Sequence, residues 1–371
     1  MQTKILHIPN YYPPHVGGIE GVCYGIVTAL PEFKHQVICF NDQTQTVKEE
    51  YEGIPVTRCG SWTKLFSQSI SFSFYKELRR VFKTFDPDIV HFHTPNPLIS
   101  VYLLLLLPKE TRLFVHWHSD IIEQDLLYLF YYWIEKLLLH RADKVLATSP
   151  AYIGGSKALT SCQDKLTIVP NTVNVDQWKK QDGDDKAIEG IKNRYERKRI
   201  IFTCGRHVPY KGLSYLIDAV PLITENAVVV IAGDGPLTDE LKEQAASLTT
   251  VHFTGRISDD ELRQYLYASD IYAFPSITRN EAFGVALAEA MYCGLPAVTF
   301  TIPFSGVNWL CLDGETGLES ENGNVQALAD AINRLLTSDD LREKLGENAT
   351  RRIESNFTIA AERKSLGELY V

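Results

Sequence analysis

The sequence contains no long hydrophobic run. Its longest unbroken apolar stretch lies at about Val101–Pro108, far short of the roughly 20 residues that a membrane-spanning helix needs. The first residues, Met1–His7, lead straight into a strand-like pattern and lack the charged and apolar regions of a secretory signal. These absences predict a cytoplasmic protein that does not span the membrane.

Paired cysteines and basic stripes are also missing. The seven cysteines are scattered, odd in number and form no C-x-x-C pair, which favours a reducing compartment over a disulfide framework. The net charge is −9, and the excess of acidic residues falls in the C-terminal half. Because no basic stripe is present to neutralise nucleic-acid phosphates, we expect no nucleic-acid partner. The sequence also shows no internal repeat and no low-complexity tract.

Short apolar runs alternate with helical patterns along the chain. This rhythm is typical of βα units and parallel sheets, and at 371 residues the chain is long enough for two domains. The expected strands are 4–8, 36–40, 89–92, 112–117, 144–148, 166–169, 199–204, 227–232, 250–253, 271–274 and 297–300. The pattern predicts an α/β fold of two doubly wound, Rossmann-like domains facing a central cleft, because ligands of such sheets bind beyond the carboxyl ends of the strands.

A charged segment, 179–198, interrupts the rhythm of strands, which restarts at Arg199. We place the domain boundary at this segment. The predicted division is an N-terminal domain over 1–175, a C-terminal domain over 176–356 and a final helix over 357–371.

The segment 275–291 holds two carboxylates, Glu281 and Glu289, on either side of a glycine that opens a helix. Free N–H groups near Phe283 to Ala286 would attract phosphate. At helical rise the two glutamates lie about 12 Å apart, too far for the carboxyl pair of a retaining glycosidase, which sits roughly 5 to 5.5 Å apart. The spacing suits contacts at opposite ends of a sugar-diphosphate-ribose. Such pairs also occur on ordinary solvated helices, so the neighbouring motifs decide between the two interpretations.

Two cations share the loop that follows the expected strand 199–204. Arg206 offers a planar fork for phosphate oxygens and Lys211 a point charge. With the helix that begins near Phe283, they could neutralise a pyrophosphate as a metal ion does in other transferases. Taken alone, both would be ordinary surface cations.

These motifs resemble the retaining GT-B glycosyltransferases of family 4, also called group 1. Further matches follow in family order over nearly the whole chain, at 17–20, 118–120, 169–174, 232–236, 254–258 and 314–318. No short motif is decisive, but the ordered set with the long block from Glu281 to Glu289 is specific. The resemblance implies a GT-B fold whose terminal helix crosses back to the first domain.

The resemblance also implies roles for single residues. The family's matching arginine and lysine hold the donor diphosphate, which assigns that role to Arg206 and Lys211. Its first glutamate, here Glu281, contacts hydroxyls of the donor sugar, and its second, here Glu289, binds the ribose hydroxyls. The donor phosphates are expected against the start of the helix, at Phe283, Gly284, Val285 and Ala286.

Further candidates lie outside the two main motifs. His118 matches the family's donor-sugar histidine, although a histidine at a strand end is otherwise often only a polar terminus. The Gly17-Gly18 pair would let backbone approach the phosphates, or it marks only a turn. It is not the G-x-G-x-x-G fingerprint, which disfavours a nicotinamide cofactor. Arg256 and Ile257 match the region that frames the nucleobase.

Two histidine pairs raise the question of a metal. His91/His93 and His116/His118 have a spacing of two, so each pair faces one side of its strand. Four imidazoles could in principle hold zinc, but no cysteine or acidic ligand shares the spacing. We therefore expect no metal site, no cofactor, and a UDP- or GDP-sugar as co-substrate.

The expected activity is transfer of a hexose-type sugar from a nucleotide-diphosphate-sugar to a hydroxyl of a cell-surface glycan precursor of the lipopolysaccharide or capsule type, with retention and without metal. The acceptor follows family habit alone. One alternative is a GT-B nucleotide-sugar 2-epimerase, which would need acid–base carboxylates flanking the sugar C2. A second is a non-catalytic subunit that binds sugar-nucleotide or glycan. Loss of a motif residue would favour it, but Arg206, Lys211, Glu281 and Glu289 are all present.

Membrane contact and donor preference stay open at this stage. The apolar segment 125–140 is either a buried helix, which we favour, or an aromatic surface for a lipid-bearing acceptor. Four cations on one helix could meet anionic head groups at the inner face of the membrane or serve only solubility: Lys76, Arg79, Arg80 and Lys83. At Ser305-Gly306 the chain departs from the Gly-Gly and Pro-Glu-like pairs of many relatives, which puts donor preference in doubt.

Overall fold

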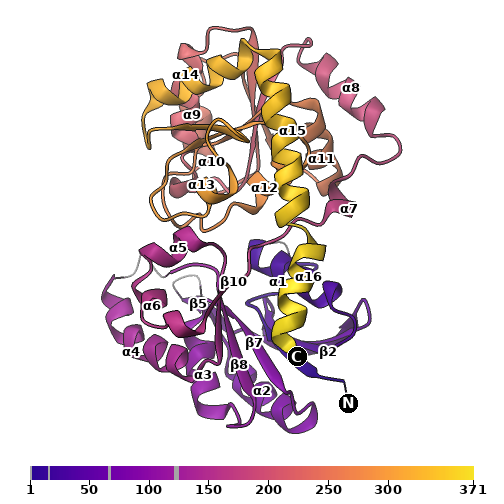
Figure 1. Cartoon of the computed structure of the whole chain (residues 1–371), viewed down its shortest axis with the longest axis vertical. Coiled ribbons are helices and arrows are strands. Elements are labelled where there is room, and N and C mark those ends of the chain that lie inside the picture. Colours follow the sequence, from indigo (N-terminus) through magenta and orange to yellow (C-terminus); the bar gives the residue numbers. More distant parts are fainter. Residues whose placement is uncertain (1, 16, 66–67, 121–124) are drawn as a thin grey trace. The chain divides into compact units, whose positions relative to one another are not determined.

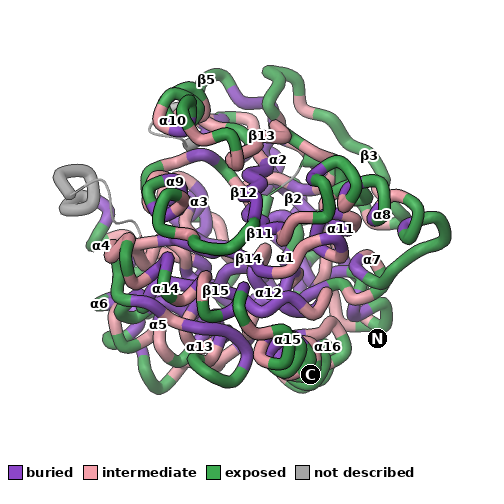
Figure 2. Tube along the Cα trace, turned by 90° about the horizontal axis from the view of Figure 1, so that it is seen from above, coloured by how far each residue is buried: buried purple, intermediate pink, exposed green. Residues whose placement is uncertain are grey.

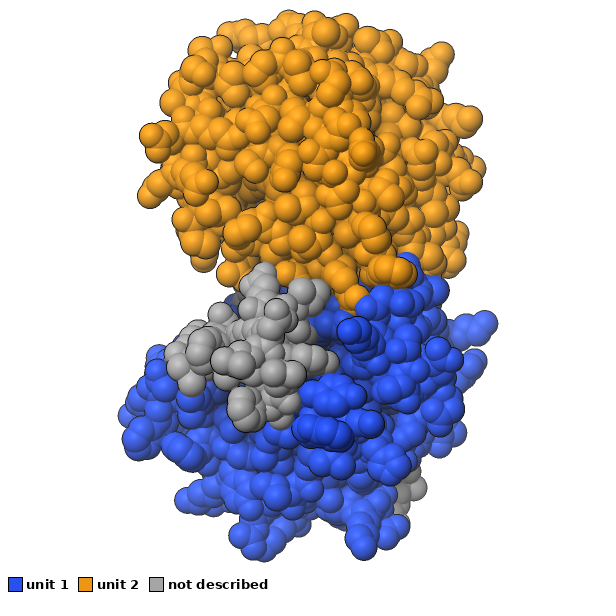
Figure 3. Space-filling model, turned by 90° about the vertical axis from the view of Figure 1, so that its left-hand side faces the viewer, with its two compact units in different colours: residues 1–171, 359–371 blue, residues 172–358 orange. Residues whose placement is uncertain are grey.

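The computed structural model describes residues 2–15, 17–65, 68–120 and 125–371, apart from the side chains of 64, 65, 68 and 125–130. The chain forms two compact units, coloured separately in Figure 3. Unit 1 contains residues 1–171 and 359–371, and unit 2 contains 172–358. The charged segment 179–198, where the sequence pattern places the domain boundary, contains helix α8 (Asp184–Arg194) of unit 2.

Unit 1 is built on an eight-stranded sheet in the order β10-β9-β8-β7-β1-β2-β4-β3, parallel except for the pairing of β3 with β4 (Figure 1). Its strands are β1 (Lys4–Ile8), β2 (Lys34–Asn41), β3 (Val47–Tyr51), β4 (Ile54–Gly60), β7 (Ile89–Thr94), β8 (Arg112–Trp117), β9 (Lys144–Ala147) and β10 (Leu166–Ile168). A separate antiparallel pair joins β5 (Thr63–Leu65) to β6 (Gln68–Ile70). The central strand β7 is buried along its whole length.

The helices of unit 1 are α1 (Gly18–Ala29), α2 (Phe72–Thr84), α3 (Pro97–Leu106), α4 (Asp125–Arg141), α5 (Pro150–Gly155), α6 (Lys157–Thr160) and α16 (Ile359–Tyr370). Helix α16 ends the chain and packs against α1. Leu366 and Tyr370 lie in the same buried cluster as Ile5, Ile26 and Phe114. The last helix of the chain therefore completes the core of the first unit.

Unit 2 has a fully parallel sheet in the order β13-β12-β11-β14-β15-β16. Its strands are β11 (Arg199–Cys204), β12 (Ala227–Ala232), β13 (Val251–Gly255), β14 (Ile271–Phe274), β15 (Ala297–Phe300) and β16 (Gly317–Ser320). The order runs outward from β11 to β13 and then returns to the other side of β11 at β14. Such a reversal is the point at which ligands of doubly wound sheets bind.

The helices of unit 2 are α7 (Val175–Trp178), α8, α9 (Leu213–Ala219), α10 (Thr238–Gln244), α11 (Asp259–Ala268), α12 (Val285–Tyr292), α13 (Val307–Leu310), α14 (Val325–Leu336) and α15 (Asp339–Asn356). They cover a sheet whose inner strands read as continuous apolar runs and are coloured as buried in Figure 2. Helix α11 opens with a capping box between Ser258 and Glu261.

Helices α8 and α11 are joined by a buried ion pair. The guanidinium of Arg263 contacts the carboxylate of Asp184 at 2.8 and 3.2 Å, and both side chains are less than 5% exposed. Hydrogen bonds from Arg263 lower the pKa of Asp184 to about 2.

No helix among the described residues has both the length and the apolar character needed to cross a bilayer.

Candidate active site

The loops after β11 and β14 meet at the reversal point of the unit 2 sheet. The two strands are neighbours in parallel register, with Ile201 beside Ile271. Ile277 donates its backbone N–H to the carbonyl of Tyr210 at 2.9 Å, which ties the two loops together. A small pocket opens between them, lined by Thr203, Cys204, Gly205, Arg206, Lys211, Leu213, Phe274, Pro275 and Ser276.

Close packing of the two loops explains Gly212 of the first motif. Its φ of 61° lies in the left-handed region, and a Cβ at this position would stand 2.1 Å from the carbonyl oxygen of Pro275. Only glycine fits both demands. Gly212 thereby holds the lysine next to it against the second loop.

Lys211 and Glu281 form an ion pair between the ammonium and one carboxylate oxygen, with both side chains mostly buried. Ser276 donates its hydroxyl to the same carboxylate oxygen at 3.2 Å. The ammonium also lies 5.1 Å from the ring centre of Phe274. Burial opposes the charge of Lys211, but the carboxylate of Glu281 outweighs it and holds the lysine pKa above its ordinary value. The two side chains are therefore in direct contact as an ion pair.

Helix α12 begins at Val285, two residues after the expected start near Phe283, and its N-cap is Gly284. The cap has a φ of 93°, where a side chain would be strained. The backbone N–H groups of the first turn, including Val285 and Ala286, have no carbonyl within the helix to bind. Free N–H groups of this kind attract anions. The side chain of Phe283 is buried against Phe357, so only its backbone faces the candidate site.

Arg206 is exposed, and its guanidinium has no partner in the part of the chain that the structure describes. Arg206 lines the pocket together with Lys211. The loop therefore carries one cation without an acidic partner among the described residues and one that is paired with Glu281.

Arg256 and Ile257 follow β13, two strands away from β11. The Arg256 side chain is 85% exposed and approaches Asp234 at 3.8 Å. Neither of the two is part of the pocket lining.

Glu289 lies on α12, away from the Lys211 pair. Burial raises the pKa of its carboxyl to about 8, and the negative charge of Asp259 adds to the effect. Cys204 and Cys293 lie close enough to feel its charge. Of the two motif glutamates, Glu281 is therefore paired with a cation, whereas burial favours the neutral form of Glu289.

The remaining candidates lie in unit 1. Gly17 is the N-cap of α1, and Gly18 begins the helix. A Cβ built at Gly18 meets nothing within 4 Å, so packing does not demand glycine there and open space lies beside the backbone. His118 directly follows β8 and is 6% exposed. Its Nε2 lies 3.0 Å from Nδ1 of His93.

The sequence motifs do not include the side chains that hold Glu281 in place. The hydroxyl of Ser305 donates to the backbone carbonyl of Glu281, and Gly306 donates its N–H to the carbonyl of Ala282 at 2.9 Å. These two residues are the pair at which the chain departs from many relatives. They support the glutamate loop, and a search of the sequence for charged residues alone could not have found them.

Comparison with known proteins decides the family. The family model described as Glycosyl transferases group 1 matches residues 184–352, and the model described as Glycosyltransferase Family 4 matches residues 16–177. The D-rhamnosyltransferase WbpZ of Pseudomonas aeruginosa is 30% identical over 363 residues, which cover 96% of this chain and 92% of the relative. The chain belongs to the group 1 glycosyltransferases. The O-antigen chain mannosyltransferase C of Escherichia coli is 29% identical to this glycosyltransferase over 370 residues, 96% of this chain and 94% of the relative.

Solved structures assign the fold of this glycosyltransferase to GT-B. A sucrose-phosphate synthase from Thermosynechococcus elongatus superposes with a TM-score of 0.82 at 20% identity, covering 100% of this chain and 98% of that one. Anabaena HepE, solved in complex with UDP and glucose, gives 0.80 at 20% identity and covers 99% of both chains. The predictions of family, of enzyme class and of a GT-B fold with two Rossmann-like domains are confirmed.

Proposed function

We propose that this glycosyltransferase moves a sugar from a nucleoside-diphosphate donor to an acceptor hydroxyl with retention of configuration and without a metal. The observation that carries the proposal is that Arg206 and Lys211 line one pocket with Phe274 to Ser276 at the reversal point of the sheet, on the loop that leads from β14 to α12. Two cations and a set of N–H donors can stabilise the negative charge that develops on a leaving diphosphate. The structural neighbour HepE is described in complex with UDP and glucose, which supports a nucleotide-sugar donor.

The relatives suggest which sugar. One is a mannosyltransferase and the other a D-rhamnosyltransferase, and D-rhamnose is the 6-deoxy form of D-mannose. Both sugars share the manno configuration, with an axial hydroxyl at C2. We therefore propose a UDP- or GDP-linked hexose of manno configuration as donor. The name of the mannosyltransferase points to an O-antigen-type, lipid-linked polysaccharide precursor as acceptor.

The proposed chemistry takes place on one face of the sugar. The bond between the anomeric carbon and the diphosphate oxygen breaks as the acceptor oxygen bonds to the same carbon from the same side. The acceptor proton passes to an oxygen of the leaving diphosphate. Arg206 and Lys211 stabilise the departing charge, Glu281 orients the sugar through its hydroxyls and Glu289 holds the ribose. The family resemblance assigns His118 to recognition of the donor sugar.

A donor panel tests the proposal. The purified enzyme is incubated with GDP-mannose, UDP-glucose and UDP-N-acetylglucosamine together with lipid-linked acceptor extracts, and the anomeric proton of the product is followed by NMR. We expect transfer from a manno-configured donor with the donor's anomeric configuration. An inverted product contradicts the mechanism. Conversion of the donor to its C2 epimer without transfer supports the 2-epimerase alternative, and binding without turnover supports the non-catalytic one.

We also propose that unit 1 contacts the membrane that carries such an acceptor. Helix α4 is not buried all round, which corrects the expected burial: Tyr131 is 6% exposed, but Trp133 is 65% exposed and Leu137 57%. The side chains of 125–130 lie outside the described residues. Helix α3 packs against both α4 and α2, and Leu105 and Phe72 add exposed apolar surface there. The four cations of α2, all exposed, lie on the same helical layer: Lys76, Arg79, Arg80 and Lys83.

Aromatic side chains beside cations suit an anionic lipid surface. We expect the enzyme to sediment with vesicles that contain phosphatidylglycerol and to stay in solution with vesicles of phosphatidylcholine alone. Trp133→Ala should weaken the binding. The matched control is Trp309→Phe in unit 2, which should not. Equal binding to both kinds of vesicle, or no effect of Trp133→Ala, contradicts the proposed surface.

A further inference from the structure

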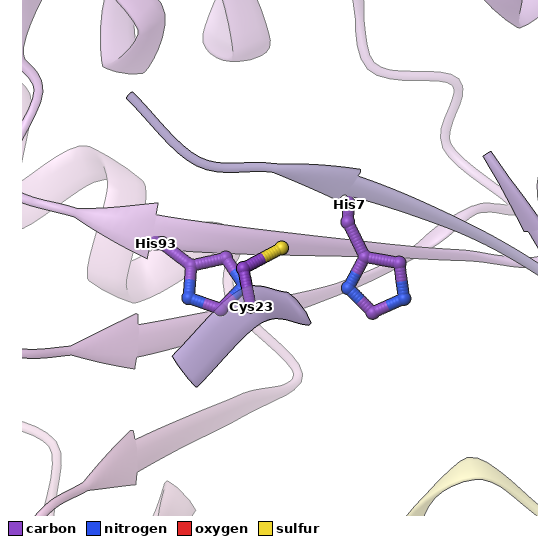
Figure 4. Close-up of side chains that lie close together, drawn as sticks. All are labelled: His7, Cys23 and His93. Carbon is purple, nitrogen blue, oxygen red and sulfur yellow. The ribbon is translucent and has the colours of Figure 1, made fainter. Parts of the chain in front are cut away.

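A cluster of buried histidines fills one face of the unit 1 sheet. His7 on β1 and His93 on β7 are completely buried, and so is Cys23 on α1, which covers that face. One nitrogen of His7, one nitrogen of His93 and the sulfur of Cys23 lie within 4.8 Å of one another. Figure 4 shows the thiol between the two rings, with one nitrogen of each ring turned toward it.

The two nitrogens that face the thiol are without hydrogen-bond partners among the described residues. They are Nδ1 of His7 and Nε2 of His93, and neither is exposed to solvent. A buried polar atom without a partner carries a desolvation cost of about 1–3 kcal/mol. Two such atoms next to a thiol indicate a bound ligand that the amino-acid chain itself does not supply.

The outer nitrogens show which protons the histidines carry. Nε2 of His35 lies 2.7 Å from the carbonyl oxygen of Leu30, and a carbonyl only accepts, so this nitrogen bears the hydrogen. A neutral imidazole carries one hydrogen, so Nδ1 of His35 accepts from Nε2 of His7 at 3.0 Å. Nδ1 of His7 is therefore a bare lone pair, the form that binds a metal ion.

We propose that Nδ1 of His7, Sγ of Cys23 and Nε2 of His93 form a binding site for one soft d¹⁰ metal ion, Cu⁺ or Zn²⁺. Thiolate and imidazole are the ligands that these ions prefer. With metal–nitrogen bonds of about 2.0–2.1 Å and metal–sulfur bonds of about 2.3 Å, ligand atoms of a trigonal site lie about 3.5–3.8 Å apart. From separations of at most 4.8 Å, the three atoms need to approach by at most about 1.3 Å.

Charge and coordination number separate the two ions. One thiolate with Cu⁺ gives a neutral unit, whereas one thiolate with Zn²⁺ leaves a net positive charge in a site without solvent, which is costly. Structural zinc also takes four ligands, and this group offers three. We therefore expect Cu⁺ to bind more tightly than Zn²⁺.

A second group of ligand atoms, on His91, His93 and His116, lies equally close together. Its geometry is less favourable, because both ring nitrogens of His91 are already engaged. Nδ1 contacts the hydroxyl of Tyr370, and Nε2 lies 3.2 Å from Nδ1 of His116. Metal binding there would break an existing hydrogen bond, so we assign the site to the group that contains Cys23.

Occupation of the site has a consequence for His118. A metal ion on Nε2 of His93 requires the hydrogen of that ring to be on Nδ1, which then donates to Nε2 of His118 across 3.0 Å. His118 would carry its own hydrogen on Nδ1. This inference rests on the proposed function, in which His118 recognises the donor sugar. His93 is then a positioning residue, because its hydrogen bond fixes the tautomer of His118.

The test measures metal binding rather than activity. Metal-free enzyme is unfolded and refolded with Cu⁺ under a thiol-free reductant, or with Zn²⁺, because a buried site is filled most readily during folding. Bound metal is then counted by mass spectrometry. We expect one equivalent of metal and a higher melting temperature in wild type. Both should be lost in Cys23→Ser and retained in Cys59→Ser, which changes another buried thiol of the same sheet.

X-ray absorption of the loaded wild type keeps the proposal testable even if a variant fails to fold. We expect one sulfur and two imidazole nitrogens around the metal. Wild type that takes up less than one tenth of an equivalent of either ion, or a spectrum without a sulfur neighbour, overturns the site. Equal losses in Cys23→Ser and Cys59→Ser overturn it as well. None of these results depends on glycosyl transfer, so the proposed function is tested separately.

Discussion

The ammonium of Lys211 is bound to the carboxylate of Glu281, 70 residues further along the chain, at the point where β11 and β14 lie side by side. The pairing implies an exchange of partners in the proposed reaction. A diphosphate that binds at Arg206 and α12 competes for the charge of Lys211, and the released carboxylate of Glu281 becomes free to accept hydrogen bonds from the sugar hydroxyls. Donor phosphate and donor sugar would then be recognised together.

Replacement of Lys211 tests the diphosphate site. We expect Lys211→Ala to lower turnover by about 10²-fold or more and to weaken binding of the nucleoside diphosphate, measured by calorimetry. The fold should survive because the residue ends a short 3-10 turn, Pro209–Lys211, outside the sheet. Lys242→Ala, on the exposed face of α10, is the control. Undiminished diphosphate affinity in a folded Lys211→Ala protein removes the lysine from the site.

The two motif glutamates should have separable effects. Glu281→Ala should lower kcat/KM while diphosphate binding stays intact or tightens, because Lys211 loses its competing partner. Glu289→Ala should mainly weaken nucleoside binding. Calorimetry with the diphosphate and steady-state kinetics with the donor distinguish the two. Equal binding defects in both variants contradict this division of roles.

Chelation tests the proposed metal independence. Because two cations and a helix N-terminus can neutralise the diphosphate, EDTA should leave the transfer rate nearly unchanged, and added magnesium or manganese should not raise it. The initial rate is compared before and after dialysis against the chelator. Loss of transfer with EDTA and recovery with manganese would show that the electrostatic argument is wrong.

The raised pKa of Glu289 predicts a pH-dependent stability. The unfolded carboxyl loses its proton near pH 4.5, whereas the folded one holds it until about pH 8. The unfolded state thus binds fewer protons between these values, so this group lowers stability as pH rises, by at most about 1.4 kcal/mol per pH unit. Glu289→Gln should remove that loss. We expect the melting temperatures of variant and wild type to diverge, in favour of the variant, between about pH 5 and pH 8; parallel curves contradict the assignment.

The buried pair of Arg263 and Asp184 should dominate the attachment of α8. Removing one partner leaves an uncompensated buried charge, so Arg263→Ala should lower the free energy of unfolding by about 3–5 kcal/mol. Asp185→Ala, which breaks the exposed pair with Lys180, is the matched control and should cost less than about 1 kcal/mol. Urea titrations at neutral pH measure both. Similar midpoints for the two variants would falsify the claim.

Much of the fold follows from local patterns in the sequence. Strands such as β8, β11, β12 and β14 have the predicted bounds, because buried parallel strands are continuous apolar runs. Two of the missed strands lack that signal. Val47–Tyr51 carries three charged residues and pairs antiparallel at the sheet edge, and Gly317–Ser320 is short with a polar end. Edge strands need less apolar surface, so their sequences resemble loops.

The sequence predicts single residues of the candidate site but not the contacts between them. The motifs identify Lys211 and Glu281, but the contact between them depends on β14 returning to the side of β11, which no local pattern encodes. The same limit applies to Cys23. Cys23 lies on a helix, whereas His7 and His93 lie on strands, so no single sequence pattern joins them. Only the packing of α1 on the sheet brings the three residues together.

The return of α16 to unit 1 makes unit 2 an insertion within unit 1. Residues 172–358 are contiguous, whereas the core of unit 1 needs Leu366 and Tyr370 from the end of the chain. During synthesis, domains usually fold from the N-terminus onward. Here the order is reversed for completion, because residues 359–371 are synthesised after all of unit 2. Unit 1 can bury Leu366 and Tyr370 only after the whole of unit 2 has left the ribosome.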